Sequence, residues 1–171
     1  VLHSIRGLKE MVQAMEHVGD RAELWLLGKW AREEMREECK AQAGWKHVRE
    51  FGMKPQAEAF AIMKMADMGI VNFMPLANHV NALPNKIFEY MALSLPMVLS
   101  DFQYWRENFG QCALFADPKK PEEIAARIAE YLDNPKMGDE KGKNGRDLIE
   151  SGFSWEKEES ILVGLYKKLL K

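Results

Sequence analysis

Two charged side chains stand out in this sequence because they interrupt its least charged segment. Between Asp67 and Asp101 only Lys86 and Glu89 are charged, although the overall charged fraction of 29% corresponds to about ten charges over that length. A charge among apolar residues is costly unless it is paired or used. The spacing of three residues puts Lys86 and Glu89 on adjacent turns of one helix, where they can pair with each other or face a ligand.

The residues before this pair predict a role for it. The loop Asn81-Ala82-Leu83-Pro84-Asn85 leads into the helix, with Asn85 or Pro84 at its start. The free N–H groups and the positive dipole end of a helix attract phosphate. Lys86 lies in this first turn, and a carboxylate at Glu89 could accept hydrogen bonds from both hydroxyls of a ribose. The pattern therefore predicts a nucleotide site, and a salt bridge between the two charges is the alternative.

The elements that would position these residues alternate between short apolar runs and longer amphipathic segments. We expect strands ending near Ser4, Leu27, Phe51, Met74 and Ser100, a further strand over 112–115, and helices between them, including one over 85–94. Three amphipathic helices follow, over 121–133, 139–151 and 155–170. This order predicts an α/β fold: a doubly wound, Rossmann-like parallel sheet with helices on both faces and a helical C-terminal tail. Ligands of such sheets bind at the carboxyl ends of the strands.

Composition excludes several classes of protein. The net charge of -2 over 171 residues lacks the basic excess of a nucleic-acid-binding protein. The two cysteines, Cys39 and Cys112, are too few for a zinc site and favour a reducing, cytoplasmic compartment. No Asp-x-Asp metal motif and no membrane-spanning segment occurs. For His79, a hydrogen-bonded loop histidine is favoured over a ligand or acid–base group, since no second His or Cys lies close to it in sequence.

A longer stretch of the chain resembles a known family. The run Asn85-Lys86-Ile87-Phe88-Glu89-Tyr90-Met91-Ala92-Leu93, continuing through Leu95–Asp101, is similar to the C-terminal half of group 1 (family 4) glycosyltransferases. Arg6-Gly7-Leu8 before a helix and Leu26-Leu27-Gly28 at a strand end agree with it. These are retaining enzymes of the two-domain GT-B fold. The resemblance implies that residues 1–171 are the donor-binding domain of a longer protein, without its N-terminal acceptor domain.

The resemblance also implies roles for individual residues. Glu89 matches the second Glu of the family's Glu-x7-Glu motif, which binds the ribose hydroxyls of the donor, whereas the first Glu of that motif is replaced by Asn81. Arg6 resembles the basic residue that neutralises the donor diphosphate, in a shorter loop than usual. The loop Phe51-Gly52-Met53 corresponds to the segment that holds the base. Together with Lys86 and the helix start, Arg6 would stabilise the negative charge of the leaving diphosphate.

The implied reaction moves a sugar from a nucleoside-diphosphate sugar to an acceptor hydroxyl, without a metal or cofactor. The resemblance to the family favours a UDP-linked donor. The acceptor is a glycan or lipid-linked sugar bound by the missing domain, as in polysaccharide or glycolipid synthesis. The location implied is cytoplasmic, or peripheral at the inner membrane face for the full-length protein. We expect the isolated chain to fold around a complete sheet and to be inactive. The alternatives are a nucleotide-sugar epimerase of the GT-B fold and a non-catalytic nucleotide-binding or interaction module.

Overall fold

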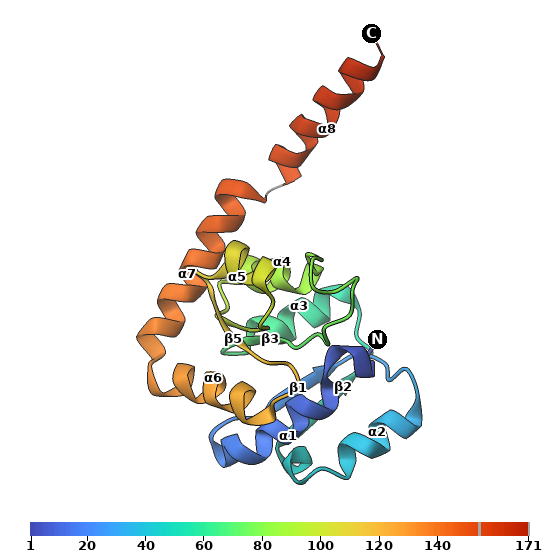
Figure 1. The fold of residues 1–171 in the computed structure, drawn as a ribbon, viewed down its shortest axis with the longest axis vertical. Helices are drawn as coiled ribbons and strands as arrows, with labels where there is room; N and C mark the ends of the chain where they lie inside the picture. The colour runs from blue at the N-terminus through green and yellow to red at the C-terminus, as the bar shows by residue number, and fades with distance from the viewer. Residues whose placement is uncertain (154, 171) are drawn as a thin grey trace.

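Short parallel strands separated by helices form the centre of the molecule (Figure 1). The computed structural model describes residues 1–153 and 155–170. The strands are β1 (Leu24–Leu27), β2 (Val48–Gly52), β3 (Gly69–Val71), β4 (Met97–Ser100) and β5 (Ala113–Ala116). The helices are α1 (Leu8–Val18), α2 (Glu33–Lys40), α3 (Gln56–Lys64), α4 (Asn85–Ala92), α5 (Gln103–Phe109), α6 (Pro121–Asp133), α7 (Pro135–Gly152) and α8 (Trp155–Leu169). Three short 3-10 turns lie at Ser4–Arg6, Gly19–Arg21 and Ala43–His47.

The strands are divided between two sheets, whereas the sequence predicts one complete sheet. β1 pairs with β2, Leu24 opposite Val48. β4 lies between β3 and β5 in the second sheet, with Met97 opposite Gly69 on one side and Ala113 on the other. All of these pairs are parallel. Residues 1–4, expected to end a first strand, contribute only an isolated parallel bridge between Leu2 and Trp30.

Helices cover both faces of the strands, which confirms the predicted α/β architecture. On one face, α1 and α6 pack against side chains of β1, β4 and β5. On the other face, α4 and α5 pack against β3 and β4. The first cluster contains Val12, Met15, Leu26, Val98, Ala116, Ile124 and Ile128. The second contains Val71, Ile87, Met91, Leu99, Trp105 and Phe109. Successive residues of β4 therefore point into different clusters, as expected for a strand buried on both faces.

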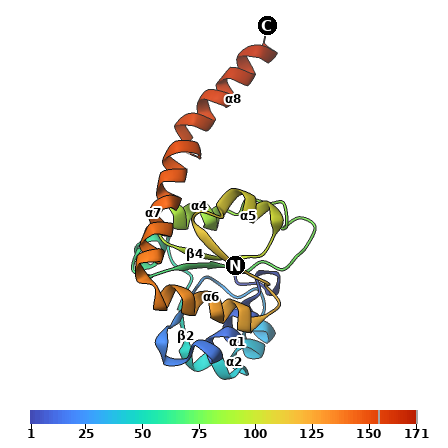
Figure 2. The same ribbon diagram turned by 60° about the vertical axis from the view of Figure 1, so that its left-hand side comes forward.

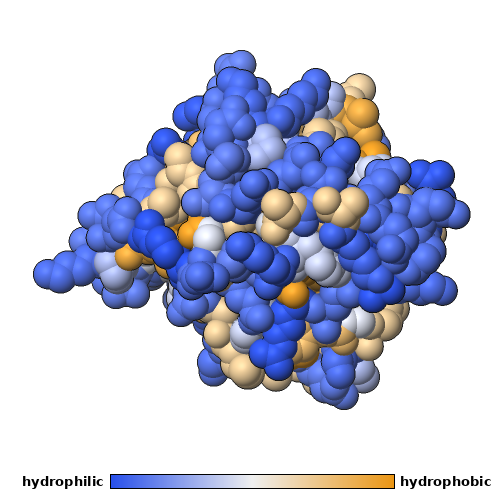
Figure 3. Space-filling view, turned by 90° about the horizontal axis from the view of Figure 1, so that it is seen from below, coloured by the Kyte–Doolittle hydropathy of each residue, from blue (hydrophilic) through white to orange (hydrophobic). Residues whose placement is uncertain are grey.

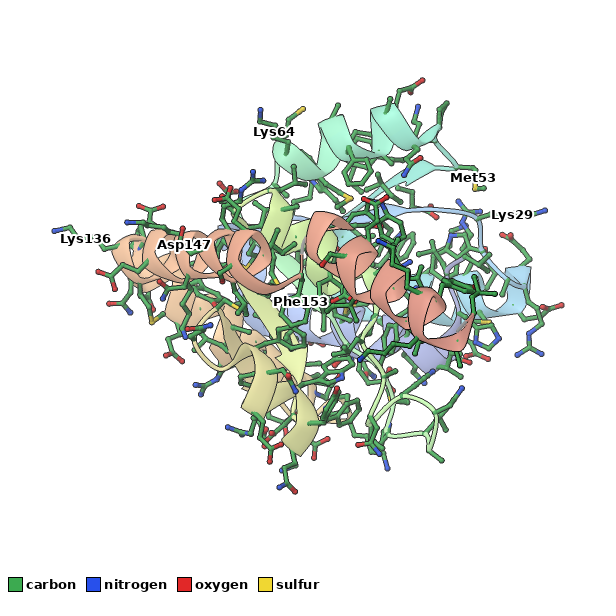
Figure 4. All side chains as sticks on the ribbon, turned by 90° about the horizontal axis from the view of Figure 1, so that it is seen from above. Lys29, Met53, Lys64, Lys136, Asp147 and Phe153 are labelled. Atoms are coloured by element: carbon green, nitrogen blue, oxygen red, sulfur yellow. The ribbon has the colours of Figure 1, made fainter. Side chains whose placement is uncertain are left out.

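A close contact between α7 and α4 encloses the second cluster. Gly138, Gly142 and Gly145 are buried in α7. A Cβ atom at Gly142 would lie 2.1 Å from the backbone oxygen of Ser94, which follows α4, so the approach depends on the missing side chain. The ring of Phe153, labelled in Figure 4, continues this contact with a centroid 5.2 Å from that of Phe88.

The last helix, α8, extends away from the rest of the molecule (Figures 1 and 2). Its solvent-exposed apolar side chains are Trp155, Ile161, Leu162, Val163, Leu165, Tyr166 and Leu169. The opposite end of the molecule is mostly hydrophilic, with small scattered apolar areas (Figure 3). The large exposed apolar side chains are therefore concentrated on α8 rather than spread over the surface.

Several element boundaries differ from the prediction for identifiable reasons. β3 ends at Val71 instead of continuing to Met74, because the side chain of Asn72 bonds to two backbone oxygens outside the sheet. α4 ends at Ala92 instead of Ser94, which has a positive φ of 56°. The helix over 103–109 was not predicted, and it buries Trp105 and Phe109. The helix predicted over 139–151 begins earlier, at Pro135.

Candidate donor-binding site

Three of the residues that the sequence singles out line one cavity. Arg6, Met53 and Lys86 come from the turn before α1, the loop after β2 and the first turn of α4. All three are among the residues that line a cavity of about 470 Å³. The fold therefore brings two cations and Met53, one residue of the predicted base-binding loop, to one cavity, which runs along β1 to its carboxyl end, where α/β sheets bind ligands.

Arg6 ends a short turn whose geometry depends on the residue that follows β3. The Cζ atom of Arg6 lies 5.2 Å from the ring centre of Phe73. The next residue, Gly7, has a φ of 55°, and a Cβ atom there would lie 2.2 Å from Asn72 Nδ2. The buried amide of Asn72 donates to the backbone oxygens of Gly7 (3.3 Å) and Pro118 (3.1 Å). Asn72 thus holds the Arg6 turn against the ends of two strands.

The loop from Asn81 to Pro84 is held by one side chain that lies outside it, and a second side chain holds the segment just before the loop. The indole Nε1 of Trp105 donates to the backbone oxygen of Ala82 at 2.7 Å. His79 Nδ1 lies 2.9 Å from the backbone oxygen of Met74, so His79 is the hydrogen-bonded loop histidine that was expected. Asn81 and Leu83 are exposed. The loop is therefore held by the hydrogen bond from Trp105 to Ala82, while Asn81 and Leu83 face solvent.

The start of α4 has no capping side chain among the described residues. Pro84 occupies the N-cap position, and in the described structure no side chain caps the helix. Asn85, the first helical residue, is exposed. A helix start without a capping side chain leaves backbone N–H groups directed away from the helix, where they can bind an anion.

Lys86 and Glu89 pair with each other, which is the alternative that the sequence left open. Lys86 Nζ lies 2.5 Å from Glu89 Oε2 and 3.7 Å from the sulfur of Met63 in α3. The two side chains are 44% and 27% exposed, so solvent reaches the pair. An exposed ion pair of this kind contributes little to stability, and a charged ligand can replace one partner at small cost.

The predicted base-binding loop lies at the end of β2. Phe51 packs against Trp25, with ring centres 5.0 Å apart, and the Cζ atom of Arg49 lies 5.0 Å from the Phe51 ring centre. Gly52 has a φ of 68° and no neighbour within 4 Å of a Cβ atom placed on it. Met53 is 75% exposed and lies near Lys29, on the same side of the molecule in Figure 4.

Burial raises the pKa of one tyrosine and of both cysteines. Desolvation raises the pKa of the Tyr90 phenol to about 12 and the pKa of both thiols, Cys39 and Cys112, to about 11. Protonated thiols at neutral pH are poor nucleophiles and metal ligands. In the described part of the chain, no group of three or more His, Cys, Asp or Glu side chains is arranged to hold a metal ion.

Only part of the predicted site lines the large cavity, and the other predicted residues lie outside it. Glu89, Asn81, Ala82, Leu83, Pro84, Asn85, Phe51 and Gly52 do not line the large cavity. Gly52 instead lines a second, shallow pocket with Met53 and Lys29. The sequence reasoning missed Asn72 and Trp105, which position the Arg6 turn and the 81–84 loop. An amide directly after an apolar strand was the available signal for Asn72.

Comparison with known proteins identifies the family and the fold of this chain. The family model described as "Glycosyl transferases group 1" matches residues 2–134, which is most of the chain. A search of curated protein sequences found no match. Within the residues described, none of the helices has the length and apolar character needed to cross a membrane.

Solved structures of several other proteins have the same fold as this chain. Sucrose-phosphate synthase from Thermosynechococcus elongatus is 21% identical to this chain, with a TM-score of 0.78. The match covers 98% of this chain and 43% of the synthase chain. Alr3699/HepE from Anabaena, in complex with UDP, is 14% identical with a TM-score of 0.83, covering 98% and 46%.

A third solved structure is itself a single domain. It is the C-terminal domain of LpcC, a group 1 family glycosyltransferase from Francisella tularensis, which is 16% identical with a TM-score of 0.74 and covers 90% of this chain and 83% of its own. The chain thus spans less than half of the two longer proteins and most of this domain. It belongs to the group 1 glycosyltransferases and has the fold of their C-terminal domain.

Proposed function

We propose that this chain is the donor-binding half of a retaining glycosyltransferase of family 4 type. The full protein would transfer a sugar from a nucleoside-diphosphate sugar to an acceptor hydroxyl, in polysaccharide or glycolipid synthesis. The observation that carries this proposal is the convergence of Arg6 and Lys86 on one cavity, beside a helix start without a side-chain cap. A similar structure, Alr3699/HepE, has been solved with UDP-glucose, which supports a UDP-linked donor.

The proposed chemistry follows from the charges around the cavity. When the bond between the sugar and the diphosphate breaks, negative charge develops on the leaving diphosphate. Arg6, Lys86 and the N–H groups at the start of α4 stabilise that charge, and they do so most strongly in the transition state, where the charge is largest. These groups belong to the chain itself, and the proposal includes no metal or other cofactor.

Glu89 is proposed to bind the ribose of the donor. In the free protein its carboxylate accepts from Lys86 Nζ. When diphosphate binds near the start of α4, Lys86 turns toward the phosphate oxygens and leaves the Glu89 carboxylate to accept hydrogen bonds from the two ribose hydroxyls. The base lies against the backbone of Phe51, Gly52 and Met53. Asn81 stands where many family members have a first Glu, beside the transferred sugar.

The acceptor is proposed to bind to a separate N-terminal domain, so we expect the isolated chain to bind donor without transferring sugar. The apolar side chains exposed along α8 suit contact with that domain. Both cysteines are unpaired thiols, which supports a reducing compartment, cytoplasmic or peripheral at the inner membrane face.

The decisive experiment compares UDP with 2′-deoxy-UDP on the original chain and on Glu89→Gln by titration calorimetry. Charge-assisted hydrogen bonds contribute about 1.5–3 kcal/mol each. We therefore expect Glu89→Gln to weaken UDP binding about tenfold or more. The preference for UDP over the deoxy ligand should shrink in this variant. Glu140→Gln, an exposed change on α7, serves as the matched control and should bind as the original does.

The ratio of the affinities for UDP and 2′-deoxy-UDP shows whether Glu89 contacts the ribose or only forms a salt bridge with Lys86. If Glu89 only pairs with Lys86, the Gln variant would leave Lys86 free for phosphate, and the ribose preference would not change. That outcome would contradict the proposed role of Glu89. Equal affinities for uridine and UDP would contradict the proposed phosphate site as well.

A further inference from the structure

Arg6 lies against an aromatic ring, whereas Lys86 is paired with a carboxylate. The Cζ atom of Arg6 lies 5.2 Å from the centre of the Phe73 ring, and Arg6 is exposed. In the described part of the chain, none of the salt bridges includes Arg6. Lys86 is paired with Glu89. The two cations that line the cavity therefore differ in what keeps them in place.

A ring and a carboxylate have different consequences for a cation that binds an anion. The face of an aromatic ring attracts a guanidinium without accepting its N–H groups as an oxygen does. The N–H donors of Arg6 therefore remain available for phosphate oxygens. Lys86 has to leave the Glu89 carboxylate before it can bind phosphate, whereas Arg6 can keep its contact with Phe73 while it binds.

The backbone around Phe73 is fixed from two directions. The Oγ atom of Ser100, which is buried at the end of β4, donates to Phe73 O at 2.9 Å. The next residue, Met74, donates its backbone N–H to Ile5 O at 2.9 Å. Ile5 belongs to the short turn that also carries Arg6. Hydrogen bonds therefore fix the position of Phe73 relative to the sheet and to the Arg6 turn.

The ring of Phe73 is also held from the side by two other aromatic rings. Its centre lies 4.8 Å from the centre of the His79 ring and 5.9 Å from that of Trp105. Both pairs are tilted, by 48° and 59°, within the range of favourable aromatic contacts. Trp105 is itself buried and hydrogen-bonded to Ala82 O. The ring that lies against Arg6 is therefore a fixed surface.

We propose that Phe73 is a positioning residue of the donor site, whose ring holds the Arg6 guanidinium ready for the diphosphate. This inference rests on the proposed function, because it requires a diphosphate that binds Arg6. Phe73 acts through Arg6 and needs no contact with the ligand. An apolar side chain without a ring would fill the same space but would not attract the guanidinium, so Arg6 would lose side-chain freedom only when the ligand binds.

The experiment measures the affinities for UDP and uridine by titration calorimetry in the original chain, Phe73→Leu and Phe73→Tyr. Uridine has no phosphate, so the ratio of the two affinities isolates the phosphate contacts. We expect this ratio to fall about threefold in Phe73→Leu, as for the loss of an exposed contact between a cation and a ring. The ratio should be retained in Phe73→Tyr, because tyrosine keeps the ring. A role in packing alone would change both affinities together.

Phe115→Leu is the matched control. The Cζ atom of Arg106 lies 5.2 Å from the centre of the Phe115 ring, the same distance as between Arg6 and Phe73. Both rings pack against the second core cluster. Phe115→Leu therefore removes an equivalent contact at another arginine and should leave the ratio of the UDP and uridine affinities unchanged.

A double-mutant cycle tests whether Phe73 acts through Arg6. Arg6→Gln removes the charge that the ring attracts. In the Arg6→Gln background, the further change Phe73→Leu should leave the ratio of the two affinities unchanged, because the interaction has already been lost. If Phe73→Leu does not fold, Phe73→Met, which is also apolar and has no ring, replaces it in the same cycle.

Proton NMR tests the contact in the free protein. Protons above the face of an aromatic ring resonate upfield, so the δ-methylene protons of Arg6 should lie upfield of those of Arg32, an exposed arginine. Their signals are identified by their absence in Arg6→Gln. The upfield position should be lost in Phe73→Leu and kept in Phe73→Tyr.

The outcomes distinguish this inference from the proposed function. An unchanged ratio in Phe73→Leu, a loss that persists in the Arg6→Gln background, or Arg6 signals at the position of Arg32 would each overturn the role of Phe73, even where the original chain prefers UDP. Equal affinities of the original chain for UDP and uridine would instead contradict the proposed function, and this inference would fail with it.

Discussion

The two sheets of this molecule are packed to different degrees, although the same alternation of strands and helices produces both. In the three-stranded sheet, β4 is paired on both edges, and every one of its side chains is buried. In the two-stranded sheet, β1 is paired on one edge and borders the cavity on the other. Amphipathic patterning is thus sufficient to place helices over strands, but close packing also requires a neighbour at each edge of a strand.

The helices that cover the two sheets show the same contrast. α7 approaches α4 through buried glycines, so that backbone lies against backbone. α3 instead faces the cavity with the flexible side chain of Met63, whose sulfur lies near Lys86 Nζ. A rigid contact and an adaptable one therefore flank α4, the helix that carries both candidate charges. The adaptable side is where ligand binding can move side chains at low cost.

The largest effect should come from shortening one buried leucine in each sheet. Leu99 in β4 is 1% exposed, and Leu26 in β1 is 4% exposed. We expect Leu99→Ala to lower the free energy of unfolding by about 4 kcal/mol and Leu26→Ala by about 2 kcal/mol. Leu26 borders an existing cavity, so its removal breaks fewer contacts. Urea unfolding of both variants measures the difference, and a cost for Leu26→Ala equal to that of Leu99→Ala would contradict the contrast between the sheets.

A smaller loss should follow from adding one methyl group to α7. Gly142→Ala brings a Cβ atom against the backbone oxygen of Ser94, which cannot rotate away. We expect a net loss of about 2 kcal/mol, because overpacking outweighs the gain of about 1 kcal/mol in helix propensity. Gly164→Ala in α8 is the matched control, since nothing lies within 4 Å of a Cβ atom there. Thermal unfolding of both should show destabilisation only for Gly142→Ala, and equal stability would mean that α7 and α4 are not in close contact.

The smallest effect concerns an ion pair beyond the end of β4. Hydrogen bonding from Arg106 lowers the pKa of the Asp101 carboxyl. The stabilisation is therefore complete above the ordinary carboxyl pKa near 4 and disappears as pH falls through the lowered value. Both side chains are partly exposed, so Asp101→Asn should cost about 0.5 kcal/mol at pH 7.

The free energy of unfolding of the original chain and of Asp101→Asn, measured between pH 2 and pH 7, tests whether this stabilisation is lost as pH falls. The two curves should differ above about pH 5 and converge at the acid end. Glu140→Gln, an exposed change without a salt bridge in the described part of the chain, should leave the curve unchanged. A difference that grows as pH falls would show that the pair does not lower the pKa of Asp101.

Features that depend on neighbouring residues in the chain were predictable from sequence. α6 begins at Pro121 and ends before Asn134-Pro135 as expected, because proline is accommodated in a first turn and Pro135 begins the next helix. Lys86 and Glu89 meet because a helix places residues three apart on one face. The fold class followed from the alternation of strands and helices, and the resemblance at 85–93 agreed with the family found by comparison.

Features that depend on distant residues were decided only by the tertiary structure. The helix over 103–109 forms because Trp105 and Phe109 fill the second core cluster, which has no local signal. Arg6 and Lys86 reach one cavity because Asn72 holds the Arg6 turn and Trp105 holds the loop before α4. The division of the strands between two sheets was likewise invisible in sequence, because strand pairing is a contact between distant segments, and hydrophobic periodicity records which faces are buried but not which edges are paired.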